Sequence, residues 1–225
     1  MKKNILLTGD SKGLGSAIRQ KLDKEYNVIG ISRTSNDIRF DLSNTDKIKY
    51  LYLDEIKKYG PIYGLINNAA LAYDDLATNL NLVALKKMYD INVFSPLVLT
   101  KYIIRDMLLN KTQGSIIHIS SISVHTGYKG LSMYASTKGA LEAFSKNISR
   151  EWGRLGIRSN IVCPGFMRTE MSSSITGPQE DKIFKRNSYM SELLVSDVAK
   201  TVEFLISNNS KGLTGQVIHV DNGTL

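Results

Sequence analysis

Short apolar runs alternate with helical stretches along the chain. Asn4–Thr8 is an apolar run that ends at Gly9, as expected of a buried parallel strand. Further strands are predicted at 27–32, 38–42, 63–67, 115–120, 158–163 and 216–220. Apolar residues recur at helical spacing between them, which predicts helices over about 14–25, 46–59, 82–110, 132–153 and 196–207.

This alternation predicts an α/β protein with a doubly wound Rossmann fold, in which helices cover both faces of a parallel sheet of about seven strands. No linker or composition shift divides the chain, so residues 1–225 are expected to form one domain. Parallel neighbours normally need a crossover of about a dozen residues, yet only 33–37 separate the second and third strands. The helix between them is therefore expected to be missing, with the third strand a short edge strand.

Composition narrows the class of protein. The 225 residues are 42% hydrophobic and 22% charged, which is typical of a globular chain and not of a disordered one. No apolar run reaches about 18 residues and the N-terminus lacks the apolar region of a signal peptide, so a membrane span and secretion are not expected. A single cysteine, Cys163, allows no disulfide within the chain and suits a reducing cytoplasm.

The net charge is +8, but the basic residues are scattered and form no long run. We therefore expect a solvated basic surface and no nucleic-acid site. Such a surface would also suit a phosphorylated cofactor or an acidic carrier protein.

A glycine-rich loop joins the first strand to the first helix. Its candidate cofactor-binding residues are Gly9, Ser11, Lys12, Gly13, Leu14 and Gly15. Glycine lets the backbone approach a pyrophosphate, and the following helix N-terminus offers free N–H groups to the anion. In this strand–loop–helix setting, the loop predicts a dinucleotide site.

The end of the second strand predicts which dinucleotide is bound. Proteins that bind NAD commonly have an acidic residue there, but this chain has Ser32 and Arg33, with Lys12 in the nearby glycine loop. Cations at these positions favour a ribose that carries a 2′-phosphate. The predicted cofactor is NADP(H).

Tyr134 and Lys138 are four residues apart in a predicted helix and so share one face. A neighbouring ammonium favours phenolate, so we expect Lys138 to lower the pKa of Tyr134 toward a range useful in acid–base catalysis. By itself a Tyr-x-x-x-Lys match in a chain with 11 tyrosines is close to chance.

The other motifs give this pair its context. Along the chain stand Asp41-Leu42, Asn67-Asn68-Ala69-Ala70, Asn92-Val93, Ile119-Ser120-Ser121, Tyr134-Ala135-Ser136-Thr137-Lys138 and Cys163-Pro164-Gly165-Phe166-Met167-Arg168-Thr169. Together with the glycine loop, and in this order, they resemble the short-chain dehydrogenase/reductase family over nearly the whole chain. The segment after Cys163 and the ending 212–223 look most like 3-oxoacyl-carrier-protein reductases.

The resemblance implies roles for single residues. Ser121 precedes Tyr134 by 13 residues, a spacing similar to that of the family's catalytic serine. The resemblance implies that Tyr134 exchanges the proton and that Ser121 hydrogen-bonds the substrate oxygen. It further implies that Lys138 holds the nicotinamide ribose and that Asn92 supports a water chain to Lys138. The remaining implied cofactor contacts are Asp41, Leu42, Asn68, Ala69, Pro164, Gly165 and Thr169.

The function implied is an NADPH-dependent carbonyl reductase that transfers hydride to a small ketone, or to a 3-oxoacyl thioester carried on an acyl carrier protein. Alternatives are a reductase or dehydrogenase of a nucleotide-sugar, a pterin or another small ketone or alcohol, and a non-catalytic NADP(H)-sensing protein. The resemblance also implies a homo-oligomer, a tetramer or a dimer, built on the helices predicted over 82–110 and 132–153.

No metal site is expected. His118, His125 and His219 are widely spaced along the chain, and Cys163 is expected to pack as a small apolar residue. Residues 171–190 are polar and contain Gly177 and Pro178, which predicts a mobile loop with a short helix near 179–186. Trp152 continues a helical apolar stripe that belongs to the core or to a subunit interface.

Overall fold

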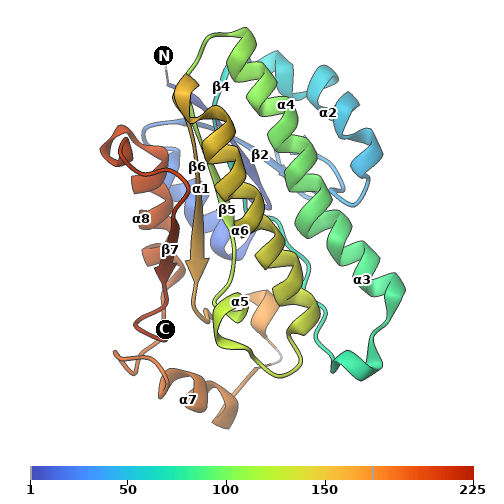
Figure 1. The fold of residues 1–225 in the computed structure, drawn as a ribbon, viewed down its shortest axis with the longest axis vertical. Coiled ribbons are helices and arrows are strands. Elements are labelled where there is room, and N and C mark those ends of the chain that lie inside the picture. The colour runs from blue at the N-terminus through green and yellow to red at the C-terminus, as the bar shows by residue number, and fades with distance from the viewer. Residues whose placement is uncertain (1, 174) are drawn as a thin grey trace.

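A computed structural model of the protein describes residues 2–173 and 175–225; Ser174, in the predicted loop, lies outside them. Over the described residues the chain forms a seven-stranded parallel sheet in the order β3-β2-β1-β4-β5-β6-β7 (Figure 1). The strands are β1 (Asn4–Thr8), β2 (Asn27–Ser32), β3 (Ile38–Arg39), β4 (Ile62–Asn67), β5 (Gly114–Ile119), β6 (Ile157–Pro164) and β7 (Val217–Val220). The predicted doubly wound fold is confirmed.

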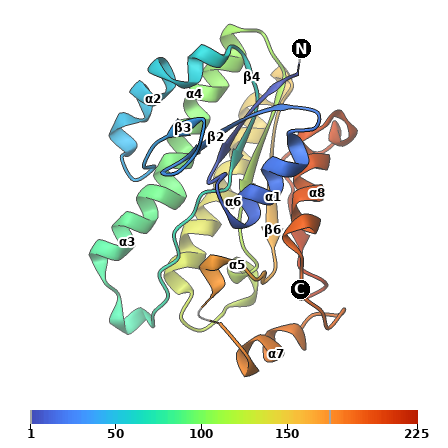
Figure 2. The ribbon, with the colours of Figure 1, turned by 180° about the vertical axis from the view of Figure 1, so that it is seen from behind.

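Helices cover both faces of the sheet. On one face α1 (Gly13–Leu22) lies beside α8 (Val195–Ile206), as Figure 2 shows, and Ile18 and Val202 are fully buried there with apolar residues of β1 and β4. The other face carries α2 (Ile48–Asp54), α4 (Ser95–Leu109) and α6 (Ser132–Trp152), which bury a second core. Both faces of the central strands are thus apolar, which explains their unbroken hydrophobic runs.

The predicted absence of a helix after β2 is also confirmed, and the structure shows what takes its place. The side chain of Ser35 is buried and donates a hydrogen bond to Asp10 at 2.9 Å. Asp37 accepts from the backbone N–H of Gly30 at 2.8 Å and pairs with Arg19 of α1 at 2.7 Å. These polar contacts fasten the short loop to α1. The edge strand β3 is shorter than the predicted 38–42 because Asp41 turns the chain by accepting from the backbone N–H of Ser43.

The helix predicted over 82–110 is not continuous. It consists of α3 (Leu82–Tyr89), a π-helical turn (Asp90–Phe94) and α4. π-Helical turns insert a residue into a helix and often occur at functional sites. The apolar spacing continues through the turn, so periodicity alone could not reveal it.

Other predicted helices are present with different ends. The one predicted over 46–59 is shortened to α2, with 3₁₀ turns at Thr45–Lys47 and Ile56–Tyr59, and Gly60 ends it with φ of 84°. α5 (Ser123–Thr126) is a short extra helix, and α7 (Pro178–Phe184) lies in the predicted loop. Among the described residues, no helix combines the length and the apolar character that crossing a membrane requires.

Candidate active site

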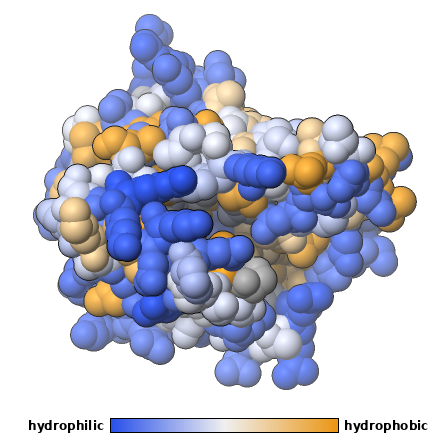
Figure 3. Space-filling view, turned by 90° about the horizontal axis from the view of Figure 1, so that it is seen from below, coloured by the Kyte–Doolittle hydropathy of each residue, from blue (hydrophilic) through white to orange (hydrophobic). Residues whose placement is uncertain are grey.

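A cavity of about 940 Å³ lies where the strands end, lined by residues that follow β1, β2, β4, β5 and β6. In open parallel sheets ligands bind at the carboxyl ends of the strands. Apart from Asn92, every residue predicted to be catalytic or to bind the cofactor lines this cavity. Figure 3 looks at the molecule from this end, where most of the visible surface is hydrophilic and hydrophobic residues gather in separate patches.

The glycine loop forms one wall of the cavity and is held tightly. Gly9 has φ of 70°, and a Cβ on Gly15 would lie 1.8 Å from the carbonyl oxygen of Gly9. The side chain of Asn68 donates to the carbonyls of Thr8 and Gly9 at 3.0 and 3.1 Å. Asn68 therefore fixes the loop from the neighbouring strand, while α1 begins at Gly13 with its first N–H groups free to meet an anion.

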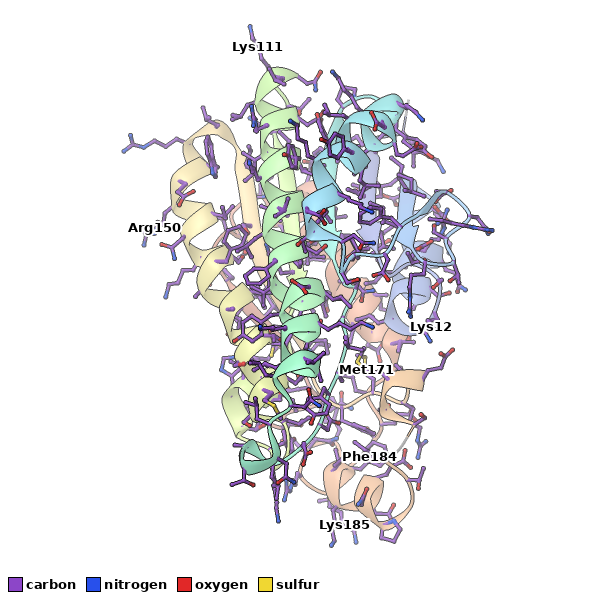
Figure 4. All side chains as sticks on the ribbon, turned by 90° about the vertical axis from the view of Figure 1, so that its right-hand side faces the viewer. Lys12, Lys111, Arg150, Met171, Phe184 and Lys185 are labelled. Carbon is purple, nitrogen blue, oxygen red and sulfur yellow. The ribbon has the colours of Figure 1, made fainter. Side chains whose placement is uncertain are left out.

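Basic residues gather at the end of the cavity beside β2. Arg33 lines it as predicted, and so does Lys87 of α3, which sequence reasoning missed. Hydrogen bonds from Ser43 lower the pKa of Asp41 below its ordinary value, and the charges of Arg33 and Lys87 lower it further. Lys12 also lines the cavity, but its ammonium forms an ion pair with Glu170. In Figure 4, Lys12 and Met171 lie on the right-hand side of the molecule, above Phe184 and Lys185.

Ser121, Tyr134 and Lys138 meet at the other end of the cavity. Lys138 is 2% exposed, and its Nζ donates to the carbonyl of Ile119 at 2.8 Å and lies 5.6 Å from the centre of the Tyr134 ring. The hydroxyl of Ser121 accepts from the hydroxyl of Ser123 at 3.0 Å. Ser120 also borders the cavity, but its hydroxyl donates to Glu142, which leaves Ser121 as the serine suited to bind a substrate oxygen.

The pKa of Tyr134 differs from the value expected from the sequence. Burial raises the pKa of Tyr134 above its ordinary value, and the charge of Asp74 raises it further. Burial also lowers the pKa of Lys138 to about 8, which weakens its positive charge in alkaline solution. The prediction of a lowered pKa for Tyr134 is therefore wrong for the protein alone, because burial disfavours the charged phenolate. Tyr134 is a protonated phenol at neutral pH.

Asn92 lies outside the cavity, in the π-helical turn, and is fully buried. Its amide accepts from the N–H of Leu71 at 2.8 Å, donates to the carbonyl of Leu71 at 2.9 Å and donates to the hydroxyl of Thr137 at 3.0 Å. It thus connects the segment after β4 to α6 one residue before Lys138.

Two histidines predicted to be dispersed lie together. The rings of His125 and His219 are edge to face with centres 4.8 Å apart, beside the buried Cys163. Their wide spacing along the chain did not reveal this pair, because only the sheet places β7 next to α5. His118 remains apart, fully buried in β5 beside Asn67.

Asp74, Lys87 and Glu170 are the charged residues of the cavity that sequence reasoning missed. Asp74 lies in the long connection after β4 and Glu170 in the turn after β6, and Lys87 belongs to a helix whose charges look like an ordinary solvated face. None of them stands in a recognisable motif. Only the tertiary fold brings them to the cavity.

Comparisons with known proteins agree with this geometry. A family model described as enoyl-(acyl carrier protein) reductase matches residues 14–224. The 3-oxoacyl-[acyl-carrier-protein] reductases FabG of Buchnera aphidicola (subsp. Baizongia pistaciae) and Rickettsia prowazekii are 31% and 32% identical to it, and each match covers 99% of this chain and 97% of the relative.

Solved structures are similar over the whole length. A 4-hydroxyisoleucine dehydrogenase mutant complexed with NADH and succinate is 26% identical with a TM-score of 0.92, and the match covers 99% of this chain and 98% of that one. ElxO with NADP bound is 28% identical with a TM-score of 0.91, and the match covers 100% and 99%.

The fold and cavity define a dinucleotide-binding α/β protein, and the comparisons make the assignment specific. The chain belongs to the short-chain dehydrogenase/reductase family, and it is an oxidoreductase that acts on CH–OH or C=O groups.

Proposed function

We propose that the protein is an NADPH-dependent carbonyl reductase with Ser121, Tyr134 and Lys138 at its catalytic centre. The observation that carries the proposal is that these three side chains line the same cavity as the glycine loop and Arg33. The cavity volume, the close-packed glycine loop and the cations beside β2 fit a phosphorylated dinucleotide. A bound nicotinamide cofactor supplies hydride to the carbonyl carbon.

The chain's own residues bind the carbonyl oxygen of the substrate and supply its proton. Ser121 donates a hydrogen bond to the carbonyl oxygen, and the protonated Tyr134 transfers its phenolic proton to that oxygen as negative charge develops. The raised pKa of Tyr134 keeps the phenol protonated for this step. Lys138 stabilises the resulting phenolate and binds the nicotinamide ribose, and Asn92 positions it through Thr137. One proton from solvent restores Tyr134.

Arg33 is the basis for a preference for NADPH over NADH. Arg33 directly follows β2, in a segment where NAD-binding proteins commonly have an acidic residue, and Lys87 adds a second cation nearby. The structural neighbours differ in this respect, since one is complexed with NADH and another has NADP bound. The preference for NADPH over NADH is therefore inferred from this chain's own residues.

The substrate we favour is a 3-oxoacyl thioester carried on an acyl carrier protein. The supporting observation is the full-length similarity to reductases named for that substrate. The net charge of +8 also suits an acidic carrier. A cytoplasmic location and a homo-oligomer, dimer or tetramer, belong to the same proposal and stay predictions.

A substrate panel tests the proposal. NADPH oxidation is measured against an acetoacetyl thioester, keto sugars, quinones and pterins, with NADH in parallel. We expect turnover of the thioester at the highest kcat/KM and a preference for NADPH. Turnover of only a keto sugar or a pterin would move the protein to one of the alternative substrate classes. Tight NADPH binding without turnover of any ketone would instead favour a cofactor sensor.

A further inference from the structure

The side chains of His125, Cys163 and His219 form a cluster outside the cofactor cavity. Each offers one ligand atom, and the three atoms lie within 4.8 Å of one another. None of the three residues lines the cavity, so the proposed reduction does not use them.

Sheet pairing places two of the three. Cys163 of β6 and His219 of β7 are direct partners in the parallel register, so their side chains project from the same face of the sheet. His125, on α5, lies over that face with its ring edge to face against His219. The thiol is buried while both imidazoles are exposed, so the cluster has an apolar floor and opens to water.

A fourth residue orients the cluster. The carboxylate of Glu142, on α6, lies 3.1 Å from Nε2 of His125 and itself accepts a hydrogen bond from the hydroxyl of Ser120 at 2.5 Å. Metal-binding histidines commonly pair their second ring nitrogen with a carboxylate, which fixes the ring and strengthens the ligand. Glu142 contacts Nε2 of His125, which leaves Nδ1 as the nitrogen for a metal ion.

We propose that His125, Cys163 and His219 bind one Zn²⁺ ion, with Glu142 orienting His125 and water in the fourth position. One thiolate and two imidazoles are a donor set that suits tetrahedral zinc. Zinc bond lengths of about 2.0–2.3 Å require ligand atoms roughly 3.4–3.6 Å apart, so the cluster closes by about 1 Å on binding. The exposed histidine rings can make this movement.

Zinc binding at this cluster requires no oxidant or reductant. The S–H bond of Cys163 breaks and its proton passes to solvent, one S–Zn and two N–Zn bonds form, and the hydrated ion releases all but one of its waters. The ion then links α5, β6 and β7 at the edge of the sheet. Because it binds the folded chain preferentially, it raises the midpoint of thermal unfolding.

Titration of the metal-free full chain with ZnCl₂, in a reductant that does not bind metals, tests the site by calorimetry. We expect one ion per chain and a higher unfolding temperature. Co²⁺ in place of Zn²⁺ should give the near-ultraviolet charge-transfer band of a thiolate ligand, which binding to surface histidines alone cannot produce.

Variants identify the ligands. Cys163→Ser should abolish the cobalt band, and His219→Gln, at an exposed position, should weaken Zn²⁺ binding by more than about tenfold. Glu142→Gln should weaken it by about 10–100-fold. Glu151→Gln, an exposed glutamate on the same helix, is the matched control and should leave the affinity unchanged.

Absence of stoichiometric binding to the folded wild-type chain would overturn the proposal. So would binding that lacks the thiolate band, or an affinity unchanged in His219→Gln, since the ion would then lie elsewhere. If Cys163→Ser fails to fold, the wild-type cobalt spectrum and His219→Gln still decide the question.

Discussion

We expect single charged side chains to determine which cofactor this cavity accepts. Arg33 is the cation at the end of β2, Lys87 lies near Asp41, and Lys12 is paired with Glu170 across the opening. Of the two cations predicted from the sequence, Arg33 is therefore the one on which the preference should chiefly depend. Lys12 must break its ion pair with Glu170 before it can bind a phosphate.

Removing Arg33 tests this assignment. A charge-assisted hydrogen bond contributes about 1.5–3 kcal/mol, so Arg33→Ala should weaken NADPH binding by roughly tenfold to a hundredfold. NADH has no 2′-phosphate and should bind as before. Arg33→Asp should reverse the preference, because its carboxylate repels the phosphate and accepts a free 2′-hydroxyl. Titrating both cofactors by fluorescence checks this, and an unchanged preference in Arg33→Asp would remove Arg33 from the ribose site.

His118 gives a second prediction, on stability. Burial lowers the pKa of His118 to about 3, helped by the charge of Lys138, whereas the unfolded chain titrates near the ordinary value of 6.5. Between these pH values the unfolded chain binds a proton that the folded chain does not. The free energy of unfolding should therefore fall as pH falls from about 6 to 4, with His118 contributing about 1.4 kcal/mol per pH unit.

Urea unfolding of wild type and His118→Gln at several pH values measures that contribution. The variant should show a shallower loss of stability in acid. Equal slopes in wild type and His118→Gln would mean that His118 is not buried as a neutral ring.

At the scale of elements, the close packing of α1 against the glycine loop shapes the cofactor wall. Gly15 lies so close to the carbonyl of Gly9 that no side chain fits between them. A Cβ on Gly153, at the end of α6, would meet nothing within 4 Å, and this residue has helical φ and ψ. The two glycines therefore form a matched pair for the same substitution.

Gly15→Ala should lower the free energy of unfolding by about 1–3 kcal/mol through overpacking, and it should weaken NADPH binding because the loop must shift. Gly153→Ala should be neutral or stabilise the fold by up to about 1 kcal/mol. Denaturant unfolding of both variants provides the comparison. Similar values for the two would contradict the tight contact between Gly9 and Gly15.

A comparison of the elements with the sequence shows which features of the fold could be predicted. The order of strands and helices, the missing helix after β2 and the motif residues of the cavity were predictable, because apolar periodicity and short motifs carry that information, whereas Asp74, Lys87 and Glu170 stand in no motif and were missed. The π-helical turn at Asn92 was not, since it leaves the periodicity intact. The contact of His125 with His219 was hidden as well, because only the pairing of β6 with β7 brings their segments together.

At the scale of the whole molecule, one cavity at the ends of the strands collects residues that lie far apart in the sequence, between Gly9 and Ile175. The glycine loop and Arg33 come from its first 33 residues, while Tyr134 and Lys138 come from α6. Burial is the dominant influence on the catalytic end, where it raises the pKa of Tyr134 and lowers that of Lys138. A phenol that stays protonated at neutral pH suits the direction of carbonyl reduction.

The central claim is that Tyr134 supplies the proton to the carbonyl oxygen, and Tyr134→Phe tests it most directly. In NADPH oxidation with an active ketone, kcat should fall by about 10²–10⁴-fold, the usual contribution of general acid–base catalysis. The dissociation constant for NADPH should stay near that of wild type. Tyr50→Phe, on the exposed surface of α2, should keep full activity. Turnover near the wild-type rate in Tyr134→Phe would contradict the account.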